Sequence, residues 1–196
     1  RMSRGITDYP QDIAPIVTNM GIDQILGSAF HPKAGKDLPV PLTIRTVSPR
    51  DPRAVALLGE SHALMDSLFP PEDNAYLDID ALCADGITFY GAEEGGELLG
   101  CAALARRDGY GEVKSMFVAP VARGIGVARR LLAHVEAQAQ AEGLPLLRLE
   151  TGEKLAAAIS LYEGHGYIRR PPFGAYESND SSLFYEKSVC ADAPEP

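Results

Sequence analysis

Residues 113–137, VKSMFVAPVARGIGVARRLLAHVEA, join three patterns that together decide the fold. An apolar strand comes first, a turn with two glycines follows, and an amphipathic helix begins directly afterwards. Arg123, Arg129 and Arg130 gather positive charge at this turn, although the whole chain has a formal net charge of −9. A helix N-terminus offers unpaired N–H groups and the positive end of the helix dipole. The stretch therefore favours a site for a multiply charged anion such as a pyrophosphate. The alternative is a glycine turn that is merely tight, beside solvated arginines.

The composition indicates a globular protein and excludes several classes. A chain of 196 residues with 45% apolar and 23% charged residues is typical of one soluble domain with a full core. The net charge of −9 argues against a general nucleic-acid binder, which carries a basic face. No apolar run approaches the roughly 20 residues of a membrane span. Three cysteines and four histidines show no metal-ligand spacing, so we expect a reduced cytoplasmic protein without a metal.

The pattern of apolar residues predicts one domain between two unstructured ends. Residues 1–40 are rich in proline and are expected to form an irregular arm that is dispensable for cofactor binding, and residues 191–196 a short tail. Between them, residues 41–190 alternate strand and helix patterns. We expect strands at 42–47, 87–94, 97–106, 111–119, 145–150, 167–170 and 182–189, and helices at 52–68, 79–84, 124–142 and 152–166. This order predicts an α/β domain whose central sheet is partly antiparallel.

Two of the predicted helices have a recognisable apolar side. In the first helix this side comprises Val55, Leu58, His62, Met65 and Phe69. In the helix after the glycine turn it comprises Ala128, Leu131, Leu132, Val135 and Ala139, with Gly143 as the C-terminal stop.

Two phosphate-binding patterns compete for the glycine turn. The dinucleotide fingerprint G-x-G-x-x-G would begin at Gly124, and Glu150 would supply its acid about 20 residues later. However, Arg129 occupies the third glycine position, and residues 120–123 separate the strand from the first glycine. A dinucleotide-binding protein is therefore the less favoured alternative.

The other pattern is Arg/Gln-x-x-Gly-x-Gly/Ala, written here as RGIGVA at 123–128. LRLETG follows the helix, AISLYEGHGY lies on the next helix, and SLFYEK forms the final strand. In this order and spacing, residues 42–188 resemble the GNAT superfamily of acyl-CoA-dependent N-acetyltransferases. The run LETGEKLAAAISLYEGHGY followed by FGAY is similar to a bacterial subgroup of that superfamily. The resemblance implies the GNAT fold, a single mixed and mostly antiparallel sheet flanked by helices. The pyrophosphate loop would lie between the central strand and the following helix.

The resemblance also implies which residues hold coenzyme A. The turn would face the diphosphate with Arg123, Gly124, Ile125, Gly126, Val127, Ala128 and Arg129. The strand before the turn would pair with the pantetheine arm through the main chain of Met116, Phe117 and Val118. The Val118 N–H would then lie near the acetyl carbonyl, where a fixed donor stabilises the developing oxyanion.

Direct transfer to an amine requires a general base. An alkyl ammonium group with a pKa of about 10.4 is protonated at neutral pH, and its deprotonation costs roughly 4.6 kcal/mol. Glu112 begins the central strand, and strand alternation predicts that it shares a face with Lys114, Met116 and Val118. The resemblance implies that Glu112 is the base. A carboxylate that is merely solvated at a strand start is the alternative.

Departure of the thiolate calls for a proton donor. Tyr162 lies on the apolar side of its helix, where most tyrosines are core residues with a satisfied hydroxyl. The resemblance implies instead that Tyr162 is the general acid. Cys101 has no histidine near it in sequence and is expected to be a small buried hydrophobic residue.

The sequence therefore predicts an N-acetyltransferase that uses acetyl-CoA and no metal, with direct attack by a primary amine of a small molecule or peptide in a ternary complex. An acyl-CoA-binding regulatory module without turnover is the rival, and a homodimer is left open. Acidic residues are expected to border the acceptor cleft: Glu60, Asp66, Glu72, Asp73, Asp78, Asp80, Glu177 and Asp180. They favour an acceptor with an additional positive charge, such as a polyamine, an amino sugar or a lysine side chain.

Overall fold

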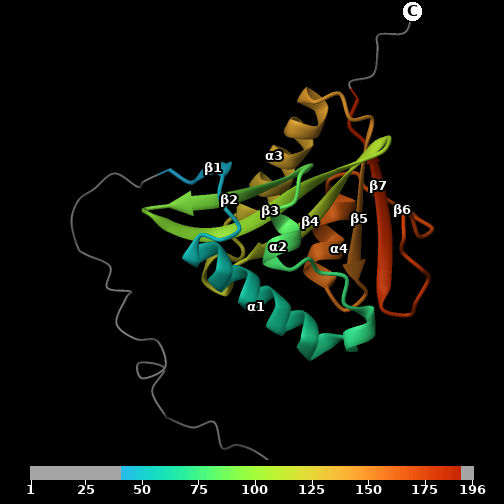
Figure 1. Cartoon of the computed structure of the whole chain (residues 1–196), viewed down its shortest axis with the longest axis horizontal. Coiled ribbons are helices and arrows are strands. Elements are labelled where there is room, and N and C mark those ends of the chain that lie inside the picture. The colour runs from blue at the N-terminus through green and yellow to red at the C-terminus, as the bar shows by residue number, and fades with distance from the viewer. Residues whose placement is uncertain (1–40, 191–196) are drawn as a thin grey trace, which may run out of the picture. The chain divides into compact units, whose positions relative to one another are not determined.

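The computed structural model describes residues 41–190, so the predicted arm at 1–40 and tail at 191–196 lie outside the described residues. One seven-stranded sheet has the strand order β1-β2-β3-β4-β5-β7-β6 (Figure 1). Its strands are β1 (Thr43–Thr46), β2 (Ile87–Glu94), β3 (Glu97–Arg107), β4 (Tyr110–Val118), β5 (Leu146–Gly152), β6 (Ile168–Arg170) and β7 (Ser182–Ser188). The pair β4–β5 is parallel and the other pairs are antiparallel. The predicted fold class, one mixed and mostly antiparallel sheet, is confirmed.

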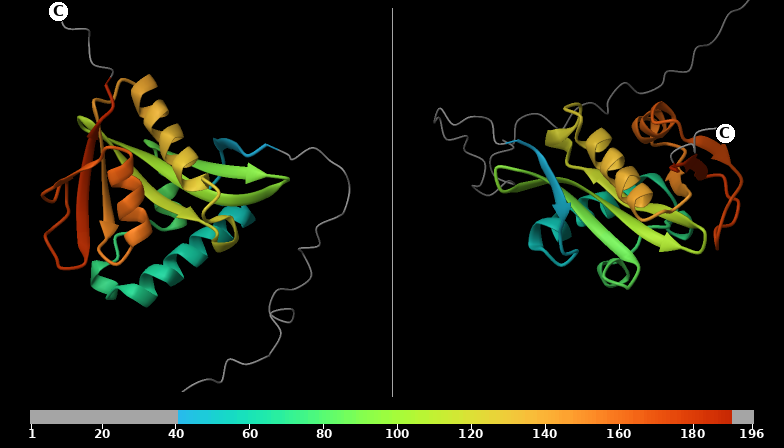
Figure 2. Two further views of the ribbon diagram at one scale, coloured as in Figure 1. Left: turned by 180° about the vertical axis from the view of Figure 1, so that it is seen from behind. Right: turned by 90° about the horizontal axis from the view of Figure 1, so that it is seen from above.

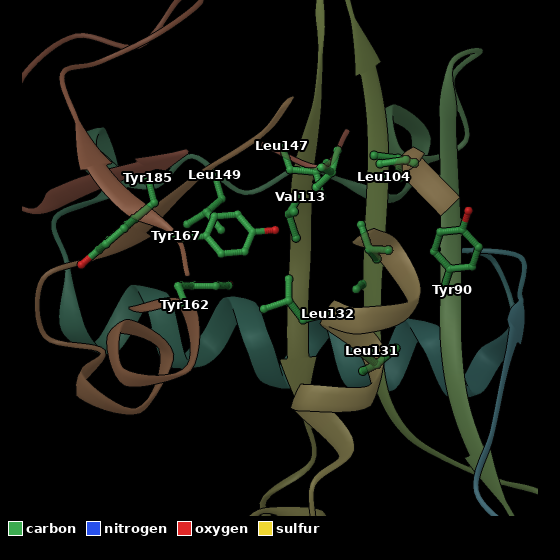
Figure 3. Packing of buried hydrophobic residues seen from close by; sticks show 14 of the residues in the cluster. Tyr90, Leu104, Val113, Leu131, Leu132, Leu147, Leu149, Tyr162, Tyr167 and Tyr185 are labelled. Carbon is green, nitrogen blue, oxygen red and sulfur yellow. The ribbon is translucent and has the colours of Figure 1, made fainter. Parts of the chain in front are cut away.

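The helices cover both faces of this sheet. They are α1 (Pro52–Leu68), α2 (Ile79–Leu82), α3 (Val127–Ala141) and α4 (Ala156–Gly164), with 3-10 turns η2 (Pro71–Asp73) and η3 (Pro120–Ala122). Helix α1 lies on one face, and α3 and α4 lie on the other (Figure 2). Each face has its own core. Leu131 and Leu132 of α3 pack with Val113 and Leu147 on one side (Figure 3), whereas Leu58 of α1 packs on the other. Full burial of a leucine side chain stabilises a fold by about 1.5–3 kcal/mol, so these two layers hold the sheet in place.

The strands β4 and β5 pair over a very short distance. Their register contains Gly111 with Leu147 and Glu112 with Arg148, and β5 pairs with β7 along its whole length. Beyond Glu112 the two strands diverge (Figure 1). The side of β4 at residues 113–118 that faces β5 therefore has no strand partner among the described residues.

A β-bulge in β4 changes the direction of its side chains. Ser115 has a φ of 49°, and the register with β3 shifts there by one extra residue of β4. As a result Val113, Met116 and Val118 all pack into the core beneath α3, whereas Phe117 packs beneath α1. The prediction that Glu112 shares a face with Met116 and Val118 is wrong, because simple alternation does not count the extra residue.

The predicted start of a helix is correct where a capping side chain is present, and it differs where glycines precede the helix. Helix α1 spans 52–68 as predicted, with the Asp51 side chain accepting a hydrogen bond of 2.9 Å from the Arg53 backbone N–H. Helix α3 begins at Val127 rather than at 124, because Gly124 and Gly126 adopt φ values of 80° and 90° that no α-helix contains. Helix α4 begins later than predicted because β5 continues to residue 152.

The predicted apolar side of α1 is only partly right. The buried residues of this helix are Ala54, Leu57 and Leu58, whereas Val55 is 40% exposed. Val55 lies about 100° around the helix from Ala54, so the small alanine faces the sheet and the valine faces away. In α3 the predicted Leu131, Leu132, Val135 and Ala139 are buried together with Val127.

Candidate functional site

A cavity of about 830 Å³ opens where β4 and β5 separate. Its size is that of a site for a cofactor or small molecule. Residues of β4, the glycine turn, the end of β5 and α4 line it on one side, and α1 with residues 73–76 and 181–182 line it on the other. Every cofactor-binding residue predicted from the sequence contributes to the lining: Met116, Phe117, Val118, Arg123, Gly124, Ile125, Gly126, Val127, Ala128 and Arg129. The fold thus gathers these residues around one space.

The glycine turn leaves the N-terminus of α3 accessible. At both Gly124 and Gly126, no atom of the described residues other than the adjacent ones in the chain lies within 4 Å of the position that a Cβ would occupy. Gly126 is the N-cap residue and has no capping side chain, so the N–H groups of the first helical turn keep their capacity to bind an anion. A pyrophosphate fits this cradle, because the missing side chains let it approach the backbone.

The arginines at the turn have different roles. Arg123 donates from Nε to the Val118 carbonyl at 3.3 Å, and its guanidinium lies 5.7 Å from the centre of the Phe117 ring. Arg129 lines the cavity and is exposed. Arg130 instead reaches back to β1 and donates to the Leu42 carbonyl at 2.5 Å. Arg123 and Arg129 therefore remain as the positive charges at the turn.

The unpaired side of β4 can hold an extended ligand chain. Residues 113–118 line the cavity along the stretch where β5 no longer pairs with this strand. Exposed N–H and C=O groups on the side of a strand bind an extended chain as an added strand would. A pantetheine arm carries amide groups that suit this side, so the residues present fit coenzyme A at both its diphosphate and its arm.

Tyr162 is buried at the centre of the cavity lining. It lies on α4, is 6% exposed, and its hydroxyl lies 3.6 Å from the Met116 Sδ. Its ring packs near Tyr167 and Tyr185 (Figure 3). Burial, together with the negative charge of Glu150, raises the pKa of Tyr162 above its ordinary value. The side chain therefore remains a neutral phenol, with its proton in place, at any physiological pH.

Glu112 lies outside the cavity lining. Its Oε1 accepts a hydrogen bond of 2.7 Å from the Tyr176 hydroxyl, and its Oε2 accepts one of 3.1 Å from Arg107 Nε. The Lys114 ammonium group lies 3.6 Å from Oε1 and itself donates to the Tyr176 hydroxyl at 2.6 Å and to the Ala75 carbonyl at 2.8 Å. The assignment of Glu112 as the general base stays a prediction.

Sequence reasoning missed a second carboxylate, Glu150, which lines the cavity. Its Oε1 accepts a hydrogen bond of 2.7 Å from the Ser182 hydroxyl. Burial raises the pKa of Glu150, and the charge of Lys114 opposes that rise. In the sequence Glu150 was considered only as the acid of a dinucleotide site. Its place at the end of β5, beside a cavity that opens from β4, depends on how the two strands separate.

Within residues 41–190, the buried cysteine is not an activated nucleophile and no cluster of metal ligands is found. Cys101 is fully buried as predicted, and burial raises the pKa of its thiol to about 12, so it is not an activated thiolate. Within residues 41–190 there is no group of three or more His, Cys, Asp or Glu side chains that could hold a metal ion. Over the same residues, no helix combines the length and the apolar character that crossing a membrane requires.

Known proteins are similar to this chain in both fold and sequence. The model of the acetyltransferase (GNAT) family matches residues 58–167. An IAA acetyltransferase from Azospirillum brasilense is 43% identical over 150 residues, covering 76% of this chain and 98% of the relative. The uncharacterized N-acetyltransferase YsnE of Bacillus subtilis is 36% identical, covering 70% of this chain and 93% of the relative. A crystal structure of a Klebsiella pneumoniae protein assigned as an acyl-CoA N-acyltransferase is 32% identical, with a TM-score of 0.64 and coverage of 76% and 97%.

The fold and the site thus define an acyltransferase, and the chain belongs to the GNAT acetyltransferase family. The resemblance found in the sequence is confirmed. The sheet also removes the dinucleotide alternative, because its strands are mostly antiparallel rather than doubly wound.

Proposed function

We propose that this protein transfers the acetyl group of acetyl-CoA to a primary amine, by direct attack while both substrates are bound. The observation that carries the proposal is that one cavity joins the glycine turn at Gly126 to a polar end that contains Lys114 and Glu150. The two ends suit two different substrates. The names of the relatives, an acetyltransferase and an N-acetyltransferase, support the same chemistry.

The donor end is supported by the charge and the free backbone of the turn. Arg123 and Arg129 lie beside the N-terminus of α3, where the helix dipole adds to their positive charge. Acetyl-CoA supplies an acetyl group already activated as a thioester. The backbone N–H of Val118 is proposed to stabilise the charge that develops on the carbonyl oxygen.

The acceptor end is polar and partly acidic. Asp73 accepts a hydrogen bond of 2.6 Å from Ser181, and both residues line the cavity. A second hollow of about 330 Å³ adjoins it, shares Asp73 with it, and is lined by Glu72 and Glu177 as well. These carboxylates support an acceptor that carries positive charge in addition to the reacting amine.

Three of the acids predicted to border the cleft are engaged elsewhere. Asp80 pairs with Arg50 at 2.7 Å, and Asp66 accepts hydrogen bonds of 2.9 and 3.0 Å from Asn74 and Tyr76. Asp78 caps α2 and accepts a hydrogen bond of 2.7 Å from the Ala81 backbone N–H. The acidic character of the acceptor end therefore rests on fewer side chains than the sequence indicates.

The proton donor in this proposal is Tyr162. Its raised pKa keeps the hydroxyl protonated, so it can give its proton to the sulfur as the carbon–sulfur bond breaks. In a buried site, sulfur departs much more readily when a proton donor converts it to a neutral thiol than when it must leave as a thiolate. A regulatory module that only binds coenzyme A would need neither this phenol nor a base. Release of free thiol from acetyl-CoA in the presence of an amine tests the proposal.

A reducing compartment suits the cysteines. Cys83, Cys101 and Cys190 are all free thiols in the structure. This supports the cytoplasm as the predicted location.

A further inference from the structure

Two glutamates lie on the same face of the sheet where β4 and β5 begin to separate. The parallel register places Glu112 beside Arg148, so Glu150 lies two residues further toward the opening. This places Glu150 across from Lys114, which follows Glu112 by two residues on β4. Of the two carboxylates, Glu150 lines the cavity and Glu112 does not.

Glu112 has little capacity left for a substrate proton. Both of its oxygens accept hydrogen bonds from protein groups, one from Tyr176 and the other from Arg107. The Lys114 ammonium lies 3.6 Å from the first oxygen, and the side chain of Glu112 is 5% exposed. The carboxylate is thus held between two cations, Arg107 and Lys114, and is separated from solvent. Its contacts are those of a group that fixes Lys114 and Tyr176 in place.

Glu150 has the opposite arrangement. The Ser182 hydroxyl holds Oε1 at 2.7 Å, and no hydrogen-bond donor within residues 41–190 reaches Oε2. The carboxylate is therefore oriented by one contact and keeps an oxygen for a ligand in the cavity. We propose that Glu150, and not Glu112, takes the proton from the ammonium group of the acceptor. This inference rests on the function proposed above.

The surroundings of Glu150 raise its affinity for a proton. The charged and titratable groups around it are Lys114 and Glu112 on β4, Arg148 on β5, Asp73 in η2, Tyr162 on α4 and Tyr176 in the loop before β7. Burial raises the pKa of Glu150, the hydrogen bond from Ser182 and the charge of Lys114 lower it, and the charge of Glu112 raises it. A base is most effective when its pKa lies near the working pH, so the net rise favours proton transfer.

The protons balance over the whole transfer. The ammonium group of the acceptor gives one proton to the free oxygen of Glu150 and becomes a neutral amine. Its lone pair forms the bond from nitrogen to the acetyl carbon, and the carbon–sulfur bond breaks with its electron pair on sulfur. Tyr162 gives its proton to sulfur and recovers the second proton of the nitrogen through water. Glu150 then releases its proton to solvent, so both residues return to their starting forms.

Kinetics of Glu150→Gln against pH tests this role, with Glu112→Gln as the matched control. Glutamine keeps the shape and can still accept from Ser182, but it cannot take a proton. With the fastest of spermidine, glucosamine and a lysine-containing peptide, we expect kcat/KM at pH 7 to fall by about 10²–10⁴-fold. The variant can use only amine molecules that are already neutral in solution. Its kcat/KM should therefore rise about tenfold per pH unit up to the amine pKa of about 10. Glu112→Gln should keep the pH profile of the wild type. The inference is overturned if Glu112→Gln shows the tenfold rise instead, or if Glu150→Gln behaves as the wild type.

Thermal unfolding gives a second readout that needs no turnover. A raised pKa in the folded state means that the native protein binds more protons than the unfolded chain, so ionised Glu150 destabilises the fold as pH rises. The melting temperature of Glu150→Gln relative to wild type should therefore increase between pH 4 and pH 7. A relative melting temperature that decreases over this range would mean a carboxylate held in its charged form, and would contradict the inference. If the stability result holds but wild type transfers no acetyl group to any amine, the proposed function fails instead.

Discussion

Tyr176 donates a hydrogen bond of 2.7 Å to Glu112 and accepts one of 2.6 Å from Lys114. The tyrosine belongs to the loop between β6 and β7, whereas its two partners belong to β4. Its hydroxyl therefore ties this loop to the strand that lines the cavity. The network is buried, with exposed side-chain fractions of 5% for Glu112 and 9% for Lys114. Loss of one member leaves the others short of partners.

The first prediction concerns this hydroxyl. Tyr176→Phe should lower the free energy of unfolding by about 1–3 kcal/mol, because a buried carboxylate and a buried ammonium each lose a hydrogen bond. Urea denaturation measures the change. Tyr76→Phe is the matched control, because its hydroxyl bonds Asp66 at an exposed position and its loss should cost less than about 0.5 kcal/mol. Equal effects of the two substitutions would show that the Glu112 network contributes no more than a surface contact.

The second prediction concerns the glycine turn. Gly126→Val places a branched side chain where a pyrophosphate would lie, and we expect binding of coenzyme A to be lost in calorimetry. The substitution also strains the backbone, because the φ of Gly126 is 90°. Gly109→Val controls for this strain, because Gly109 has a φ of 77°, open space around it, and no part in the cavity. Unchanged affinity in Gly126→Val, or equal loss in Gly109→Val, would contradict a diphosphate site at this turn.

The third prediction separates catalysis from packing at Tyr162. Tyr162→Phe should lower kcat by about 10²-fold or more, with little change in the KM for acetyl-CoA, because the hydroxyl acts when the sulfur departs. In the wild type, the raised pKa of Tyr162 keeps its proton in place, so no loss of activity from its ionisation should appear below about pH 10. Tyr167→Phe is the control, since that hydroxyl is buried nearby without a partner in the described residues and outside the cavity lining. A kcat that survives Tyr162→Phe while the melting temperature falls would leave Tyr162 a core residue.

The fourth prediction concerns the charge of the acceptor. Glu72, Asp73 and Glu177 lie around the second hollow and should attract a cationic amine at long range. The kcat/KM for spermidine should therefore fall steeply as ionic strength rises from about 0.01 M to 1 M, where the screening length shrinks from about 30 Å to 3 Å. An uncharged aromatic amine provides the comparison and should show little dependence. Faster turnover of glutamate or aspartate than of spermidine would contradict the acidic acceptor end.

Local patterns in the sequence were enough to predict the fold and to group the residues proposed to bind the cofactor. Residues 123–129 are contiguous, so the two glycines, the two arginines and the start of the following helix lie close together in space. All ten predicted cofactor residues line one cavity for this reason. The apolar pattern of α3 likewise predicted the core residues Leu131, Leu132, Val135 and Ala139, because it depends only on the periodicity of that helix.

The acceptor end could not be predicted in the same way. The bulge at Ser115 adds one residue to β4, and only the three-dimensional register with β3 shows it. Glu150 gains its position from the short pairing of β4 and β5, and Ser182 reaches it from a strand 32 residues away in sequence. Tyr176 meets Glu112 across a separation of 64 residues. Contacts of this kind arise from how strands are placed, and no single stretch of sequence contains them.

The central claim is that this chain transfers an acetyl group and does more than bind the donor. The most direct measurement incubates the protein with acetyl-CoA and an amine, then follows free thiol and the mass of the amine together. The account predicts thiol released in a one-to-one ratio with N-acetylated amine, abolished in Gly126→Val and strongly reduced in Tyr162→Phe. Tight binding of coenzyme A with no thiol released for any amine would contradict it and would favour a regulatory module.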